Sequence, residues 1–130
     1  MIGYLAGGMR SGWQDAVMAA PPAIDWRDPR THALTDERAY TAWDVTAIID
    51  ADLVFAYMEI DNPGGQGLAL EIGLAAGLNA AMGAICGEKT IILVDPGHHR
   101  YLGMARALAT TVCATLEEGI REAARLRETS

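Results

Sequence analysis

Short runs of apolar residues alternate with longer segments in which apolar positions recur at helical spacing. The runs at residues 53–58 and 89–94 are apolar at almost every position, which is typical of strands in a parallel sheet covered on both faces. Glycine-bearing loops follow the runs, as expected where strands and helices alternate. Strands are expected at residues 2–6, 53–58, 89–94 and 110–113, with at most one more within 23–35.

Helix signals fill the intervals between these strands. Ser11 can cap a helix that runs to about residue 20, before a pair of prolines, and Asp36 can cap a second one that runs to about residue 50. A third helix is expected at about 67–82, and residues 115–118 have capping-box spacing at the start of the last helix. The pattern therefore predicts a single α/β domain over residues 1–130. Its architecture would be a Rossmann-like or flavodoxin-like parallel sheet of about five strands, flanked by helices on both faces.

One stretch without charged side chains, residues 72–87, has to be compared with a membrane span. It is shorter than the roughly 20 residues that a span requires, it contains Asn79, and it directly follows Glu71. We expect a buried helix there and no membrane association.

Composition narrows the function classes. Hydrophobic residues make up 51% of the 130 residues and charged residues 21%, which excludes a disordered chain. The net charge of -7 argues against a nucleic acid polymer as partner. Cys86 and Cys113 lack metal-ligand spacing, so we expect no metal site at them. Nothing resembles a secretory leader, and a cytoplasmic location is expected.

Ligands of open parallel sheets bind at the carboxyl ends of the strands, which here selects residues 7–13, 59–71 and 95–100. In the first segment, Gly7 and Gly8 allow backbone N–H groups to approach a ligand, and Arg10 adds a positive charge. The same glycines are equally consistent with a plain structural turn. In the third segment, residues 98–100 suit a phosphate, a subunit contact or a solvated loop.

Three side chains suggest chemistry on a glycosidic bond. Glu71 lies about one turn inside a glycine-led helix among apolar neighbours, where the positive helix end favours the ionised carboxylate that such cleavage needs as a nucleophile. A glutamate that merely complements the helix dipole is the alternative. Asp44 lies on an otherwise apolar side of its helix, as a second reactive carboxyl or as a partner for a loop. An inward Tyr4 hydroxyl would need a partner.

Several motifs, in the same order along the chain, resemble the nucleoside 2-deoxyribosyltransferases, a family that includes the related 2'-deoxynucleoside 5'-monophosphate N-hydrolases. The motifs are Tyr4-Leu5-Ala6-Gly7-Gly8-Met9, Asp44 with Asp52-Leu53-Val54, Gly67-Leu68-Ala69-Leu70-Glu71-Ile72-Gly73, and Thr90-Ile91-Ile92-Leu93-Val94.

The resemblance implies an enzyme that cleaves the N-glycosidic bond of 2'-deoxynucleosides. Glu71 would be the nucleophile that forms a covalent glycosyl-enzyme, Asp44 would help protonate the leaving base, and Tyr4 would orient Glu71. The deoxyribosyl unit would pass to another nucleobase, with no metal or cofactor. The partner would be a small-molecule nucleoside or nucleotide, and the assembly a homo-oligomer in which a neighbouring subunit helps complete the pocket.

The chain also departs from the family pattern. Where the transferases often carry an aspartate, six residues before the nucleophile, this chain has Gly65, and Asp61 lies further back. Gly8 to Gly12 resembles the phosphate loop of the hydrolases, with Arg10 matching its arginine. Hydrolysis of a 5'-monophosphate, a nucleotide-binding module without turnover, and a plain interaction domain therefore stay open. With Gly64 to Gly67 shaping the sugar site, the candidate substrate-binding residues are Gly7, Gly8, Met9, Arg10, Trp43 (for stacking on a base), Asp61, Gly65 and Gly67.

Overall fold

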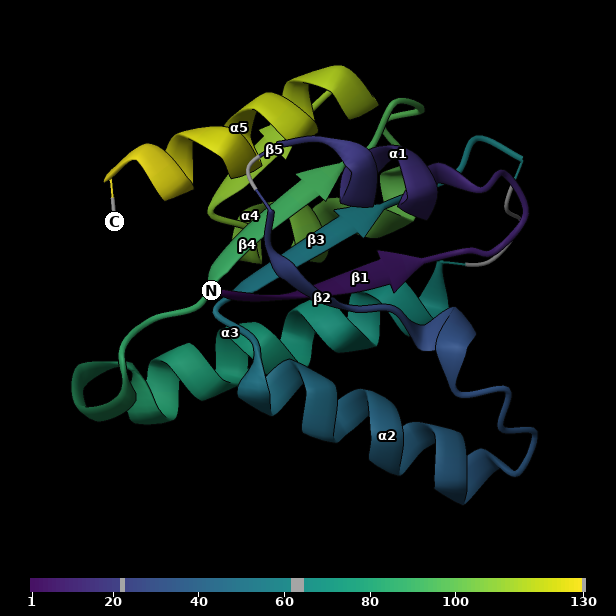
Figure 1. Cartoon of the computed structure of the whole chain (residues 1–130), viewed down its shortest axis with the longest axis vertical. Coiled ribbons are helices and arrows are strands. Elements are labelled where there is room, and N and C mark those ends of the chain that lie inside the picture. The colour runs from purple at the N-terminus through teal and green to yellow at the C-terminus, as the bar shows by residue number, and fades with distance from the viewer. Residues whose placement is uncertain (22, 62–64, 130) are drawn as a thin grey trace.

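Five parallel strands form one sheet in the order β2-β1-β3-β4-β5 (Figure 1). The computed structural model describes residues 1–21, 23–61 and 65–129. The strand order is that of flavodoxin-like folds, so the predicted fold class is confirmed. The strands are β1 Ile2–Gly7, β2 Asp25–Arg27, β3 Leu53–Tyr57, β4 Thr90–Val94 and β5 Thr111–Cys113. The helices are α1 Trp13–Ala19, α2 Glu37–Asp50, α3 Gln66–Cys86, α4 Gly103–Leu108 and α5 Leu116–Thr129, with 3-10 turns at Pro29–Thr31 and Arg100–Leu102.

The two faces of the sheet have separate apolar cores. Along β3, Val54 and Ala56 belong to the cluster beneath α2, α3 and α4, whereas Leu53 and Phe55 belong to the cluster beneath α1 and α5. Figure 1 shows α1 and α5 on one side of the strands and α2 and α3 on the other. The strands are apolar at successive positions because side chains on both faces are covered.

The switch point of the sheet lies between β1 and β3. From β1 the chain passes to β2 on one side and then to β3 on the other, and Gly7 at the end of β1 lies opposite Tyr57 at the end of β3. Gly7 has a φ of 147°, and a Cβ there would collide with the Tyr57 carbonyl oxygen. The two strand ends approach this closely because residue 7 is glycine.

The cap predicted for α2 is confirmed, whereas the cap predicted for α1 is wrong. Asp36 Oδ2 accepts a hydrogen bond from the Ala39 N–H at 3.0 Å, which ends the chain's extended stretch and starts α2. The N-cap of α1 is Gly12, in the left-handed region and without a side-chain cap. Ser11 lies one residue before this cap, and its backbone N–H donates to the carboxylate of Glu59.

Helix α3 is longer and more exposed than the sequence predicted. It extends over 21 residues to Cys86, and by length and composition it could cross a membrane. Only 17% of its most apolar window is buried. Its buried residues, Leu68, Ile72 and Ala75, face the sheet. The expectation of a buried helix is therefore wrong for the second half of α3, whose outer side chains have no cover within the described chain.

Candidate active site

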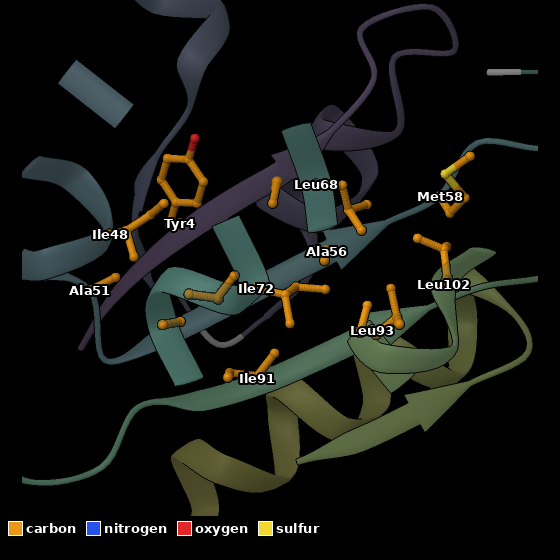
Figure 2. Close-up of a cluster of buried hydrophobic side chains, with 14 of the residues drawn as sticks. Tyr4, Ile48, Ala51, Ala56, Met58, Leu68, Ile72, Ile91, Leu93 and Leu102 are labelled. Atoms are coloured by element: carbon orange, nitrogen blue, oxygen red, sulfur yellow. The ribbon is translucent and has the colours of Figure 1, made fainter. Parts of the chain in front are cut away.

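Tyr4, Glu71 and Asp44 come from three different elements and converge beneath the α2–α3 layer. Tyr4 is fully buried on β1, and its hydroxyl donates a hydrogen bond to Glu71 Oε2 of α3. Asp44 of α2 lies near enough to the same hydroxyl for its negative charge to raise the pKa of Tyr4. Figure 2 shows the Tyr4 ring beside Ile48 of α2, with its hydroxyl at the end of the ring that points away from the strands. The fold thus brings together the three residues predicted as catalytic.

A hollow of about 460 Å³ opens between α2 and α3 above this group. Its volume lies within the range of small-molecule sites, and its walls are mostly apolar, with two carboxyl groups among them. It is lined by Tyr40, Thr41, Asp44, Val45, Ile48, Gly67, Leu70, Glu71 and Leu74.

Opposing effects act on the pKa of the Glu71 carboxyl. The pKa of Glu71 is raised from 4.5 to about 7: burial raises it most, the hydrogen bond from Tyr4 opposes this rise, and the negative charge of Asp44 adds to it. We expected the helix end to keep this group ionised. Glu71 is, however, the sixth residue of α3, beyond the first turn in which the helix dipole acts most strongly, and desolvation dominates.

The other two members of the group have raised pKa values as well. Burial, and then the charge of Glu71, raise the pKa of Tyr4, so its hydroxyl remains a donor at any ordinary pH. Burial raises the pKa of Asp44, against the lowering effects of His32 and Tyr4. Two carboxyl groups whose pKa values are raised in one hollow are a typical arrangement for acid–base and nucleophilic chemistry.

His32 extends this group beyond the predicted residues. Its Nε2 lies 3.6 Å from Asp44 Oδ1, and its ring packs edge-on against Trp43 with 4.9 Å between centroids. No sequence motif marks it, because it lies in the irregular stretch between β2 and α2, and only the folded chain places it against α2.

The glycine loop after β1 is bound by a carboxylate of this chain. Glu59, which is 3% exposed, accepts the Ser11 N–H at 2.6 Å and the Arg10 N–H at 3.2 Å. Sequence reasoning gave Glu59 no role, although its position two residues after the end of β3, at the switch point, was a usable signal. The backbone N–H groups of Arg10 and Ser11 are therefore already paired with a carboxylate of this chain.

The remaining predicted binding residues are distributed around these two centres. Gly67 lines the hollow between α2 and α3. Trp43 faces the opposite side of α2, where it lines a separate hollow with Arg27 and Leu34. The carbonyl of Asp61 accepts a hydrogen bond from the Arg10 guanidinium at 3.2 Å.

The first loop and the entry to α3 complete the predicted set. The Gly8 carbonyl accepts the Trp13 and Gln14 side-chain N–H groups, and Met9 is exposed. Gly65 caps α3 with a φ of 94°, a conformation that disfavours an aspartate there. Gly64 lies outside the described residues.

Two other features, a second hollow and an ion-pair cluster, lie apart from these carboxyl groups. A larger one, of about 590 Å³, lies beside β5 and α5, but the two carboxyls with raised pKa values line the smaller one. At the end of β4, the Asp95 carboxylate is paired with the His99 ring at 2.7 Å and with Arg106 at 2.9 Å. Among residues 1–21, 23–61 and 65–129, no group of three or more His, Cys, Asp or Glu side chains could hold a metal ion.

Known structures share this fold over nearly the whole chain. A conserved protein from Enterococcus faecalis V583 matches with a TM-score of 0.68 and 16% identity, covering 98% of each chain. The CMP N-glycosidase BcmB of Clostridium botulinum matches with a TM-score of 0.63 and 21% identity, covering 97% of this chain and 99% of that one. No family model matches, and neither does any curated protein sequence. At these identities, the comparisons show the fold.

Proposed function

We propose that this protein is an enzyme that cleaves the N-glycosidic bond of a 2'-deoxynucleoside. The observation that carries the proposal is the convergence of Tyr4, Glu71 and Asp44 at a hollow of about 460 Å³. The similarity in fold to a CMP N-glycosidase supports the reaction class, and so does the resemblance of the motifs to the nucleoside 2-deoxyribosyltransferases. A purely structural role would not require two carboxyl groups at the same opening, because burying them destabilises the fold.

In the first step, an ionised Glu71 oxygen attacks the anomeric carbon C1'. The C1'–N bond breaks, its electron pair goes to the nucleobase, and Asp44 donates a proton to the departing base. The product is a glycosyl ester on Glu71, with Asp44 as a carboxylate. Tyr4 donates to the Glu71 oxygen that does not attack and fixes the rotamer of this carboxyl.

In the second step, an acceptor attacks C1' and releases Glu71. With a nucleobase as acceptor, a base nitrogen forms the new C1'–N bond and passes its proton to Asp44, and the reaction is a transfer. A water molecule in the same place gives hydrolysis. Transfer is our first proposal, on the strength of the motifs, and hydrolysis the second, on the strength of the N-glycosidase neighbour.

We further propose that the substrate is a free nucleoside rather than a 5'-monophosphate. Strands rise about 3.3 Å per residue, so the loop after Gly7 begins about 10 Å from Tyr4, within reach of the 5' end of a nucleoside at Glu71. The Glu59 carboxylate already binds two amides of that loop, and its negative charge opposes a phosphate.

The test is to incubate the protein with a panel of 2'-deoxynucleosides and their 5'-monophosphates, with and without an acceptor base. Chromatography of the products should show free base or exchanged nucleoside for the wild type. Glu71→Gln, which keeps the hydrogen bond from Tyr4, should lower turnover by at least roughly 1,000-fold while the circular dichroism spectrum stays unchanged. Turnover by Glu71→Gln at the wild-type rate would exclude Glu71 as the nucleophile. Failure of the wild type to release any base would exclude the proposed reaction.

A further inference from the structure

One oxygen of Asp44 lacks a hydrogen-bond donor within the described chain. Asp44 Oδ1 is shielded from solvent and has no partner at hydrogen-bond distance among the residues that the structure describes. The Tyr4 hydroxyl has a single proton, which it donates to Glu71, so it cannot also donate to Asp44. A shielded carboxyl oxygen normally has a donor, so the surroundings of Asp44 Oδ1 have to be searched for one.

His32 carries the ring nitrogen, Nε2, that faces Asp44 Oδ1. The Leu34 backbone N–H donates to His32 Nδ1 at 2.9 Å, so in the neutral ring the proton lies on Nε2. Nε2 in turn lies 3.6 Å from Asp44 Oδ1, a separation that a movement of less than about 1 Å converts into a hydrogen bond.

The surrounding structure holds the His32 ring in this orientation. The imidazole is 10% exposed and packs against Trp43 at an interplanar angle of 62°. The next residue, Ala33, has a φ of 51°, an uncommon value for a residue with a Cβ, which lets the chain turn back so that the Leu34 N–H reaches Nδ1. The local backbone therefore fixes both the tautomer and the direction of the ring.

We propose that His32 is a positioning residue for Asp44, and this inference rests on the proposed function. Its Nε2–H engages Oδ1 and leaves Oδ2 for the leaving nucleobase. When the C1'–N bond breaks, the proton on Oδ2 passes to the base nitrogen and Asp44 becomes a carboxylate. The hydrogen bond from His32 stabilises that carboxylate at the moment it forms, so the proton is released more readily.

The tautomer can be measured without substrate. In protein carrying ¹⁵N-labelled histidine, a long-range ¹H–¹⁵N spectrum at a pH where the ring is neutral should show the His32 proton on Nε2, with Nδ1 unprotonated. Assignment uses the signals that disappear in His32→Gln. A proton on Nδ1 would overturn the proposal whether or not the protein turns over nucleosides, and so this measurement is independent of the proposed function.

Kinetics separate positioning from a merely structural role. His32→Gln keeps an N–H near the place of Nε2, His32→Asn moves it to the place of Nδ1, and His32→Leu removes it while retaining bulk against Trp43. With a series of nucleosides that differ in the basicity of the leaving base, drawn from the purines or 5-halogenated pyrimidines that the wild type accepts, kcat is compared for each variant.

We expect His32→Leu and His32→Asn to lose roughly 10- to 100-fold in kcat with the most basic leaving base and much less with the most acidic one. His32→Gln should recover most of this loss. An equal loss across the series, or no recovery in His32→Gln, would contradict the proposal, because a structural defect does not depend on how much protonation the leaving base needs. If the wild type releases no base at all, the proposed function fails, and the nitrogen spectrum still decides whether His32 can donate to Asp44.

Discussion

The buried carboxyl of Glu71 makes the stability of the protein depend on pH in an unusual direction. Its pKa of about 7 in the folded chain lies above the unfolded value of 4.5, so between these values the folded state binds more protons than the unfolded state. The free energy of unfolding therefore falls as pH rises through this window. Below about pH 4.5 the Glu71 carboxyl is protonated in both states and does not lower the free energy of unfolding. Above about pH 8 it is ionised in both states, and burying its charge lowers the free energy of unfolding by the full amount.

This predicts that Glu71→Gln stabilises the protein only at higher pH. Because one pKa unit corresponds to about 1.4 kcal/mol, the gain should approach about 3 kcal/mol above pH 8 and be close to zero near pH 4. Urea denaturation of both proteins at several pH values measures the difference. Glu88→Gln, at an exposed position, is the control and should show no such trend. A gain for Glu71→Gln that is the same at pH 4 and pH 8 would mean that the carboxyl is not perturbed by burial.

Glu59 carries the second residue-scale prediction, which concerns the 5' end of the substrate. In Glu59→Ala, the amides of Arg10 and Ser11 lose their carboxylate partner and the loop loses a negative charge. The ratio of kcat/KM for a 5'-monophosphate to that for the free nucleoside should then rise by at least roughly 10-fold, because the freed amides can bind an anion. Glu88→Ala removes the same charge at an exposed position and should leave the ratio unchanged. A wild-type preference for the monophosphate would refute this role of Glu59.

Sequence reasoning reached some site residues and missed others for a physical reason. Glu71 and Asp44 stand out because each is a carboxylate on an apolar stretch of helix, and Tyr4 stands out as a hydroxyl within a buried strand. His32 and Glu59 act through contacts to residues 12 and 48–49 positions away along the chain, from segments without regular periodicity. Such contacts depend on how loops pack, which a single sequence does not encode in any local pattern.

At the scale of elements, the sheet was predictable because its strands are covered on both faces. A continuous run of apolar residues is favourable in a strand that is covered on both faces. The observed β1, β3, β4 and β5 lie within a residue or two of the predicted segments. Short elements are harder to predict from sequence. Helix α4 was not predicted, because six residues are too few to show a helical period. The predicted cap of α1 was wrong by one residue, because the cap is Gly12 in the left-handed region, without a side-chain hydrogen bond that a capping motif could reveal.

Helix α3 has large apolar side chains on its exposed side as well as on the side that faces the sheet. Sequence alone could not separate its sheet-facing residues from its outer ones, because alanine, leucine, isoleucine and glycine occupy both sides. Leu70 and Ile85 are 75% and 81% exposed. Exposed large apolar side chains gathered on neighbouring helices are typical of an interaction surface. The exposed large apolar side chains of α2 and α3, which are here called the outer apolar face, are Tyr40, Ile49, Leu70, Met82 and Ile85.

For the whole molecule, we propose that a second copy of the chain covers the outer apolar face. Tyr40 and Leu70 belong both to this face and to the lining of the hollow that contains Glu71. A second copy on this face would therefore also exclude water from the proposed site, which strengthens the electrostatic interactions inside it. The homo-oligomer implied by the sequence resemblance thus has a physical use in the proposed reaction.

The prediction is that Ile85→Glu dissociates the assembly and lowers turnover together with it. Light scattering coupled to gel filtration should give a mass above that of the 13.9 kDa chain for the wild type and a mass near it for the variant, because a charge buried at an interface is costly. Met104→Glu is the matched control, since Met104 on α4 is 82% exposed, against 81% for Ile85, and lies outside the outer apolar face. It should remain associated and active. A wild type that runs as a monomer at every concentration at which it turns over substrate would show that the site is complete within one chain. Dissociation by Met104→Glu but not by Ile85→Glu would instead place the interface on the α4 side of the molecule.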